Sequence, residues 1–222
     1  MKKYNVNRSR ARNAISLVLS LIMIVAGAAL IASFFLAGRL DSTATNSDNP
    51  GGFNVPKLET TPGRENTSNA GPSDKTLELT VPAMARVEHD DIPYTKGTDE
   101  EALKTHAAIH LKGTGFPWDN EANVYIAGHR LGYPNTESWL TFWDLNNVDV
   151  GDKIYVTDAN GTEYTYTVFK TFVVSPSDTH VTDIQPGKNI LTLQTCTLPD
   201  YKQRLIVQAE LTDTTQKTQK AA

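Results

Sequence analysis

The chain opens with a long apolar run, and its later hydrophobic segments are all much shorter. Residues 14–38 contain no charged side chain. At ~1.5 Å per helical residue this stretch reaches roughly 37 Å, enough to cross a hydrocarbon core of about 30 Å with some tilt. A cleaved signal peptide has an apolar region of only about 7–15 residues. We therefore predict an uncleaved transmembrane helix over residues 14–38.

The charges beside this helix predict its orientation. The segment 1–13 carries five basic residues and no acidic one. Basic flanking segments stay on the cytoplasmic side of a membrane. We therefore predict a cytoplasmic basic segment over residues 1–13, a single membrane pass, and an extracellular location for everything that follows.

Polar composition then separates a tether from a folded domain. Residues 39–75 consist mainly of Ser, Thr, Asn, Asp, Gly and Pro, with few large apolar side chains. Such a segment buries too little surface to offset the entropy of folding, so we predict a flexible extracellular linker. Residues 214–222 form a polar tail. The remaining segment, 76–213, has the size of one domain with a core of its own.

Within this domain, short β-type runs dominate. Apolar and polar residues alternate over residues 77–81, and Asn160-Gly161 joins two β-rich runs as a hairpin turn does. Residues 98–106 are the best helical segment, with Thr98 as the N-cap, and residues 139–145 predict a short helical turn. Many short strands with little helix favour a closed barrel or a sandwich. The predicted strands cover residues 77–81, 123–127, 153–157, 164–174, 190–195 and 204–211.

Charge and composition exclude two classes of site. The chain has a net charge of −4, but the residues after position 38 carry 16 basic and 25 acidic side chains, which gives −9. An acidic outer domain without a Lys/Arg cluster does not predict nucleic-acid binding. One cysteine and five scattered histidines show no zinc-ligand spacing. We therefore predict no metal and no cofactor.

The single cysteine, Cys196, ends a β-type run, and Arg204 begins the next one. An exported protein gains nothing from an idle thiol, and the thiolate form of cysteine is a strong nucleophile. His129 directly follows another predicted strand and is a candidate general acid and base. Each residue also has a structural interpretation: a buried thiol, a solvated histidine and a strand-edge charge. Together, in this order, they favour an extracellular cysteine acyl transferase.

The sequence here resembles the sortase family. Thr192-Leu193-Gln194-Thr195-Cys196 matches the family's TLxTC signature, Arg204 follows at the expected place, and Ala127-Gly128-His129-Arg130 matches its GH segment. The resemblance covers roughly residues 77–211. It implies a mainly β fold, an eight-stranded barrel with one or two short helices, behind the single N-terminal transmembrane helix.

The resemblance also implies a reaction on Gram-positive cell surfaces. Sortases cut a C-terminal sorting signal of the LPXTG kind between Thr and Gly, hold the protein as a thioester, and pass it to an amine. That amine belongs to a cell-wall precursor, such as lipid-linked peptidoglycan, or to another protein. Carried over by position, Cys196 is the nucleophile, His129 transfers protons, and Arg204 holds the substrate or oxyanion. Thr195 is either a pocket support or a core threonine, and Arg130 is interpreted as a structural or rim charge.

The subclass that the sequence most resembles is class E, whose members favour Ala at the second signal position, as in LAXTG. The resemblance is carried by Ala127-Gly128-His129-Arg130, Ser175-Pro176-Ser177-Asp178 and the short connection between Cys196 and Arg204. The segment between Tyr133 and Trp143 is longer than usual for class E, and Thr-Leu-Pro follows Cys196 in place of His-Pro. A pilin polymerase of class C is the first alternative, although Phe116-Pro117-Trp118 only loosely echoes its lid motif. An L,D-transpeptidase is a second alternative, but the Ser-His-Gly-Cys run of that class is absent from this sequence. A non-catalytic surface-binding module leaves the Cys-His-Arg set unexplained.

Overall fold

The computed structural model describes residues 23–24, 27, 55 and 71–216. The chain divides into two compact units, Met1–Asn46 and Ser47–Ala222. In the first unit, Met23, Ile24 and Gly27 are helical. The predicted cytoplasmic segment, and all but these three residues of the predicted membrane helix, lie outside the described residues. Across the described part of the chain, no helix combines the length and apolarity that crossing a membrane requires.

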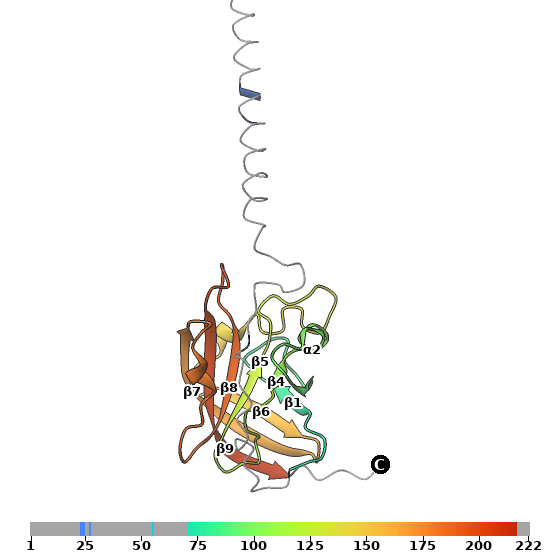
Figure 1. Ribbon diagram of the computed structural model, residues 1–222, viewed down its shortest axis with the longest axis vertical. Helices are drawn as coiled ribbons and strands as arrows, with labels where there is room; N and C mark the ends of the chain where they lie inside the picture. The colour runs from blue at the N-terminus through green and yellow to red at the C-terminus, as the bar shows by residue number, and fades with distance from the viewer. Residues whose placement is uncertain (1–22, 25–26, 28–54, 56–70, 217–222) are drawn as a thin grey trace, which may run out of the picture. The chain divides into compact units, whose positions relative to one another are not determined.

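The second unit is built on one mixed sheet of nine strands among its described residues, in the order β2-β1-β6-β7-β9-β8-β5-β4-β3 (Figure 1). The longest strands, β7 and β9, pair antiparallel along most of their length. The elements are β1 (Leu77–Thr80), β2 (Asp90–Ile92), β3 (Tyr94–Thr95), α2 (Glu100–Thr105), β4 (Ile109–Leu111), β5 (Ala122–Ala127), η2 (Leu145–Asn147), β6 (Lys153–Asp158), β7 (Thr162–Val174), η3 (Thr179–Thr182), β8 (Asn189–Cys196) and β9 (Arg204–Gln216).

The two outermost strands of this sheet are neighbours in the sequence. β2 ends at Ile92 and β3 begins at Tyr94, so Pro93 alone joins the two edges. The sheet must therefore curl until its edges approach, which gives the nearly closed barrel. The mainly β, barrel-like prediction is confirmed. The sheet has nine strands rather than eight because Pro93, which lacks an N–H donor, divides this stretch in two.

The six strands predicted from the sequence are all present, with ends that differ by a few residues. The predicted Asn160-Gly161 hairpin is also confirmed, since β6 and β7 pair antiparallel across it. The short strands β2, β3 and β4 were not predicted. Each has only two or three residues, too few to show an alternating pattern.

The two predicted helical segments fare differently. Helix α2 forms, but its N-cap is Asp99 and not Thr98, because the Asp99 carboxylate accepts a hydrogen bond from the Ala102 N–H at 3.1 Å. The helical turn predicted over residues 139–145 is replaced by turns that end in η2. Leu140 adopts a φ of 58°, and a left-handed residue interrupts a right-handed helix.

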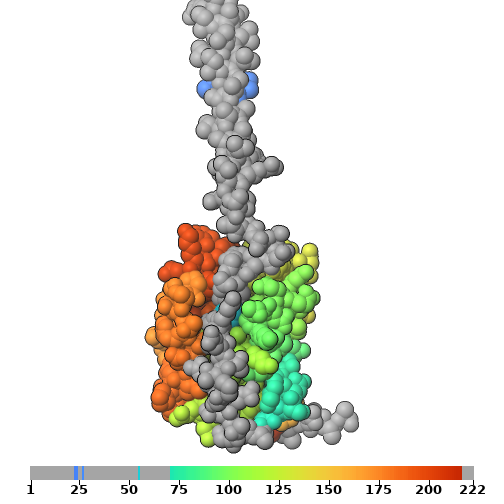
Figure 2. Space-filling model, viewed as in Figure 1, coloured from blue at the N-terminus to red at the C-terminus, as the bar shows by residue number. Residues whose placement is uncertain are grey.

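Apolar side chains form two clusters on opposite faces of the central strands. The larger cluster fills the barrel and includes Leu191 and Leu193 of β8. The second cluster contains Cys196 together with residues of α2 and the end of β7. Val55, from the range predicted as linker, is 7% exposed and belongs to this second cluster. Figure 2 shows one face of the domain, with a green surface, the colour range of α2, on one side and an orange surface, the colour range of β7 and η3, on the other.

We expect Val55 to contribute to the stability of the domain although it lies far upstream of β1. Replacing Val55 with Ala removes two buried methyl groups and should lower the free energy of unfolding by about 1–2 kcal/mol. Val150 is the matched control because it is 66% exposed, so Val150→Ala should change the value by less than about 0.5 kcal/mol. Urea unfolding of the purified protein measures both, and equal effects of the two substitutions would contradict a packing role for Val55.

Candidate active site

The candidate nucleophile, Cys196, is the last residue of β8. Every residue of this strand is buried, so it is covered on both sides. Alternate residues of a strand point to opposite faces. Leu191 and Leu193 pack in the barrel cluster, whereas Cys196 packs in the second cluster outside it. The thiol therefore lies on the outer face of the sheet.

Strand β9 brings Arg204 directly opposite Cys196. The two strands pair antiparallel, and the register places Cys196 against Arg204 at the end of the ladder. Directly opposed residues of an antiparallel pair project to the same face. Arg204 is 2% exposed, and its Nη1 donates to the carbonyl oxygens of Tyr201 and Gln203 at 3.0 and 3.1 Å. The guanidinium is thus held over the end of the strand that carries the thiol.

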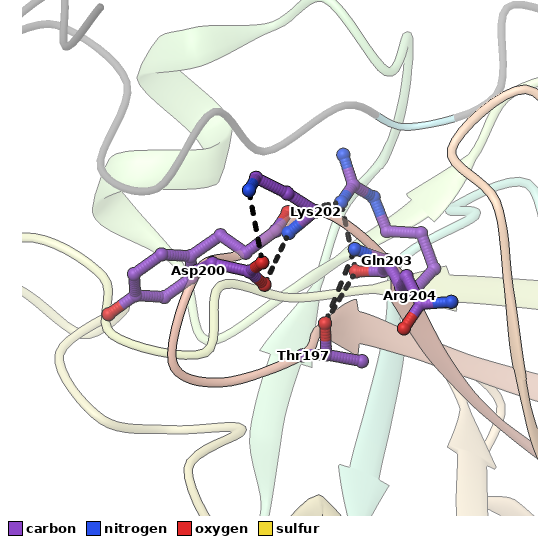
Figure 3. A network of polar contacts seen from close by, with 6 residues as sticks. Thr197, Asp200, Lys202, Gln203 and Arg204 are labelled. Atoms are coloured by element: carbon purple, nitrogen blue, oxygen red, sulfur yellow. Dashed lines mark hydrogen bonds and ion pairs between the residues drawn. The ribbon is translucent and has the colours of Figure 1, made fainter.

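The loop between the two strands is tied by its own polar contacts (Figure 3). The Thr197 N–H donates to the Gln203 carbonyl at 3.0 Å, and the Gln203 N–H donates to the Thr197 hydroxyl at 3.2 Å. Lys202 pairs with the carboxylate of Asp200 at 3.4 Å. Tyr201 has a φ of 56°, a strained conformation for a non-glycine residue, and its carbonyl is one of the two acceptors of Arg204.

Strand β5 carries His129 to the same end of the sheet. β5 pairs parallel with β8, with Ala127 opposite Gln194, and two further residues along each chain lead to His129 and Cys196. The Gly128 N–H donates to the Gln194 carbonyl at 3.0 Å, which continues the pairing past the strand end. The Thr195 hydroxyl donates to the Gly128 carbonyl at 2.8 Å. Thr195 therefore positions the peptide that precedes the histidine.

Glycine is required at position 128 by close packing. A Cβ there would lie 2.9 Å from the Phe142 ring and 3.0 Å from the Ala107 carbonyl oxygen. Both distances are shorter than ordinary carbon contacts. The backbone at position 128 therefore lies closer to Phe142 and Ala107 than a residue with a Cβ atom would allow.

Burial controls the protonation of the thiol and the imidazole. Cys196 and His129 are each 1% exposed. Burial raises the pKa of Cys196, and the charges of Arg204 and Arg130 oppose this rise. Burial lowers the pKa of His129 to about 4, and its ring lies edge-on to that of Tyr133 with centroids 5.5 Å apart. At neutral pH the pair is therefore a thiol and a neutral imidazole.

The structure brings together all four residues singled out from the sequence: His129, Thr195, Cys196 and Arg204. None of them is more than 2% exposed. Cys196 is thus almost fully buried in this conformation. A thiol, an imidazole and a guanidinium are the groups that acyl transfer through a thioester requires.

A buried polar network on the same face was not found from the sequence. The Thr192 hydroxyl donates to Asn123 at 2.8 Å and accepts from Gln208 at 3.3 Å. The Asn123 amide donates to the carbonyls of Val181 and Asp183 at 2.9 and 3.0 Å. This network anchors η3 and its flank to the three central strands. Only Asn123, a buried amide within an otherwise apolar run, offered a signal.

Two further groups complete the description of the site. The Tyr125 hydroxyl donates to the side-chain oxygen of Gln194 between this network and Cys196. Burial raises the pKa of Tyr125, against a smaller opposing effect of Arg204.

Within the part of the chain that the structure describes, no three His, Cys, Asp or Glu side chains gather as metal ligands would.

Comparison with known proteins agrees on one family. A family model described as "Sortase domain" matches residues 79–212, more than half of the chain. Sortase A of Streptococcus agalactiae serotype III (strain NEM316) is 31% identical over 138 residues, which cover 62% of this chain and 50% of that protein. The chain thus spans about half the length of this relative.

Solved structures show the same relationship. Sortase C-3 of Streptococcus pneumoniae superposes with a TM-score of 0.55 at 27% identity, over 63% of this chain and 64% of that one. A sortase D5 transpeptidase of Clostridium perfringens superposes with a TM-score of 0.52 at 27% identity, over 62% and 79% of the two chains. These relatives carry the designations A, C and D.

Buried histidines should make the fold sensitive to acid. His110 is fully buried, and burial lowers its pKa to about 3, although its Nε2 is hydrogen-bonded to the Gly115 carbonyl at 3.0 Å. The unfolded chain binds the proton at an ordinary pKa of about 6.5. Stability is therefore complete above that value and falls as pH decreases below it, by up to about 1.4 kcal/mol per pH unit for each such histidine.

Urea unfolding across a series from about pH 5 to pH 7.5 measures this slope. His110→Gln removes one titrating group and should flatten the acid limb. His180→Gln, at an exposed position, is the matched control and should leave the limb unchanged. An acid limb equally steep in the His110 variant and in wild type would contradict the assignment.

Proposed function

The chain belongs to the sortase family, and from this premise we propose that it is a cysteine transpeptidase in which Cys196, His129 and Arg204 carry the reaction. The observation that supports this most is the convergence of three strand ends. Cys196 lies opposite Arg204 across the β8–β9 ladder. His129 emerges beside them through the Gly128 peptide, which Thr195 holds.

The first half-reaction forms a thioester. The Cys196 sulfur attacks the carbonyl carbon of the signal's Thr, and the peptide bond from that carbon to the Gly nitrogen breaks. His129 accepts the thiol proton and delivers it to the departing amine. Because burial disfavours both the thiolate and the imidazolium, the ion pair forms at the moment of attack rather than at rest. The negative oxygen that develops lies within reach of the Arg204 charge.

The second half-reaction transfers the acyl group to an amine. The incoming nitrogen attacks the same carbonyl carbon, the carbon–sulfur bond breaks, and His129 accepts the proton that the amine loses. The thiol is thereby restored. Water in place of the amine would release the free acid, so the acceptor determines whether the product is anchored or lost.

We propose a sorting signal of the LPXTG or LAXTG kind and a cell-wall precursor amine as acceptor. The class E motifs support the LAXTG form. The structural likeness to Sortase C-3 supports a pilin-type protein as the alternative substrate. A library of quenched signal peptides, tested with and without amine acceptors, separates these choices by which peptide turns over.

The assay that tests the proposed function is turnover of such a peptide by active-site variants. Cys196→Ala removes the nucleophile and should abolish both cleavage and thioester formation. His129→Ala should block amine release and acyl transfer alike. Arg204→Ala should lower turnover by at least about 100- to 1,000-fold, because the loss of one oxyanion donor typically lowers turnover by that factor.

Arg204→Lys is the informative companion because it keeps the charge and loses the planar fork of donors. It should remain slow but measurably faster than Arg204→Ala. Folding of each variant is checked by urea unfolding. A folded Cys196→Ala protein that still cleaved the peptide near the wild-type rate would refute the whole proposal.

We also propose that the protein is a single-pass membrane protein with an extracellular catalytic domain. The support is the uncharged stretch 14–38 and the five basic residues before it. Protease added to intact protoplasts should release a soluble fragment that begins after residue 38. A mature N-terminus generated within or just after residues 14–38 in untreated cells would contradict an uncleaved anchor.

A further inference from the structure

Arg130 follows the candidate proton carrier, and the structure places it inside the protein rather than at the rim. It is 7% exposed although it lies in a loop. Its Nη2 donates to the side-chain oxygen of Asn146 at 2.5 Å. Its guanidinium carbon lies 5.8 Å from the centre of the Trp143 ring. Both contacts come from the segment that returns toward β6, so this segment fixes the direction of the arginine.

These contacts leave the cation incompletely compensated. Among the described residues no carboxylate lies within ion-pair distance of Arg130, and its buried Nε has no hydrogen-bond partner. The charge of Asp144 partly opposes the lowering of the Arg130 pKa by burial. A buried charge and a buried unsatisfied donor each cost free energy. Arg130 bears both costs one residue after His129, which the β5–β8 pairing carries to the end of β8 where Cys196 lies. This position points to a role in the charged state of that thiol.

The charged and titratable groups around the thiol come from each element that packs near it. Arg204 belongs to β9, and His129 and Arg130 follow β5. The charges of both arginines lower the pKa of Cys196. Arg130 also interacts electrostatically with Tyr201 of the β8–β9 loop. Tyr125 interacts electrostatically with Arg204, and Asp144 and Tyr201 interact with Arg130. His129 lies at the same end of the sheet.

We propose that Arg130 is a second positioning cation of the site, which together with Arg204 stabilises the Cys196 thiolate as it forms. This inference rests on the proposed function for its purpose. Its physical content is narrower: a buried guanidinium, held by Asn146 and Trp143, supplies positive potential to the sulfur. When the thiol loses its proton, Arg130 gains the negative counterpart that the resting site does not give it.

The test is the pH dependence of Cys196 alkylation by iodoacetamide in the full-length protein. Cys196 is the only cysteine, so the reaction reports on one thiol. Arg130→Gln should raise the midpoint of the pH–rate profile by about half a unit to one unit, the lower end of what one nearby charge contributes. Arg130→Lys keeps the charge and should restore at least half of that shift. The ultraviolet absorbance of the thiolate, with Cys196→Ala as blank, gives the same midpoint without requiring access for the reagent.

A surface substitution tests the same idea without removing the arginine. Asn146 is exposed, and Asn146→Asp puts a carboxylate on the atom that Arg130 already contacts, which offsets the guanidinium charge and should also raise the midpoint. Asn147→Asp is the matched control, because it adds the same charge at the neighbouring position without contacting Arg130. It should shift the midpoint less than Asn146→Asp does. Arg86→Gln, at an exposed site, should not shift it.

The outcomes separate this inference from the proposed function. A folded Arg130→Gln protein with an unchanged midpoint would overturn the inference, whatever the peptide assay shows. If that variant does not fold, equal midpoints for Asn146→Asp and Asn147→Asp would overturn it. If wild type fails to cleave any signal peptide while the midpoint shifts as expected, the proposed function fails and the inference about the thiol stands.

Discussion

The site depends on the register among three neighbouring strands, β5, β8 and β9. Side chains alternate between the faces of a sheet, so a slip of one residue moves a whole set from one face to the other. The observed register puts Ala127, Gln194 and Ile206 in one row, with Cys196 opposite Arg204 in the row beyond on the same face. A one-residue slip of β8 would send Cys196 into the barrel cluster. The pairing of the strands therefore brings the candidate residues together, and contacts in the loops add to this placement.

This register is reinforced at two points along β8. In the middle of the strand, Thr192 joins Asn123 and Gln208 across all three strands. Near the end of the strand, the Thr195 hydroxyl donates a hydrogen bond to the Gly128 carbonyl. Buried polar groups are costly when unpaired, so alternative registers that break these bonds are disfavoured. The two threonines of the TLxTC signature, Thr192 and Thr195, thus stabilise the strand register, a role distinct from that of the thiol.

Elements with a long, regular sequence pattern were predicted well, whereas features that depend on contacts between distant segments were predicted poorly. Strands of four residues or more and the Asn160-Gly161 hairpin were predicted, because alternation and turn chemistry are local properties. The strands β2, β3 and β4 were missed because each is too short to show a period. The candidate residues His129, Cys196 and Arg204 were proposed from motif order, and the strand pairing carries them to one end of the sheet. Their burial was not predicted, since it depends on segments distant in sequence, and neither was the position of Arg130, which depends on Asn146 and Trp143.

Burial gives the site its particular electrostatic character. Removing solvent raises the pKa of the thiol and lowers that of the imidazole, so the reactive ion pair is disfavoured until negative charge forms beside a fixed cation. The same removal of solvent strengthens every charge that remains, because fewer waters screen it. In the proposed mechanism, Arg204 and Arg130 therefore act on the sulfur more strongly than exposed arginines would. The same proposal implies that the thiol stays protonated at rest and reacts when a substrate supplies the carbonyl oxygen on which the negative charge develops.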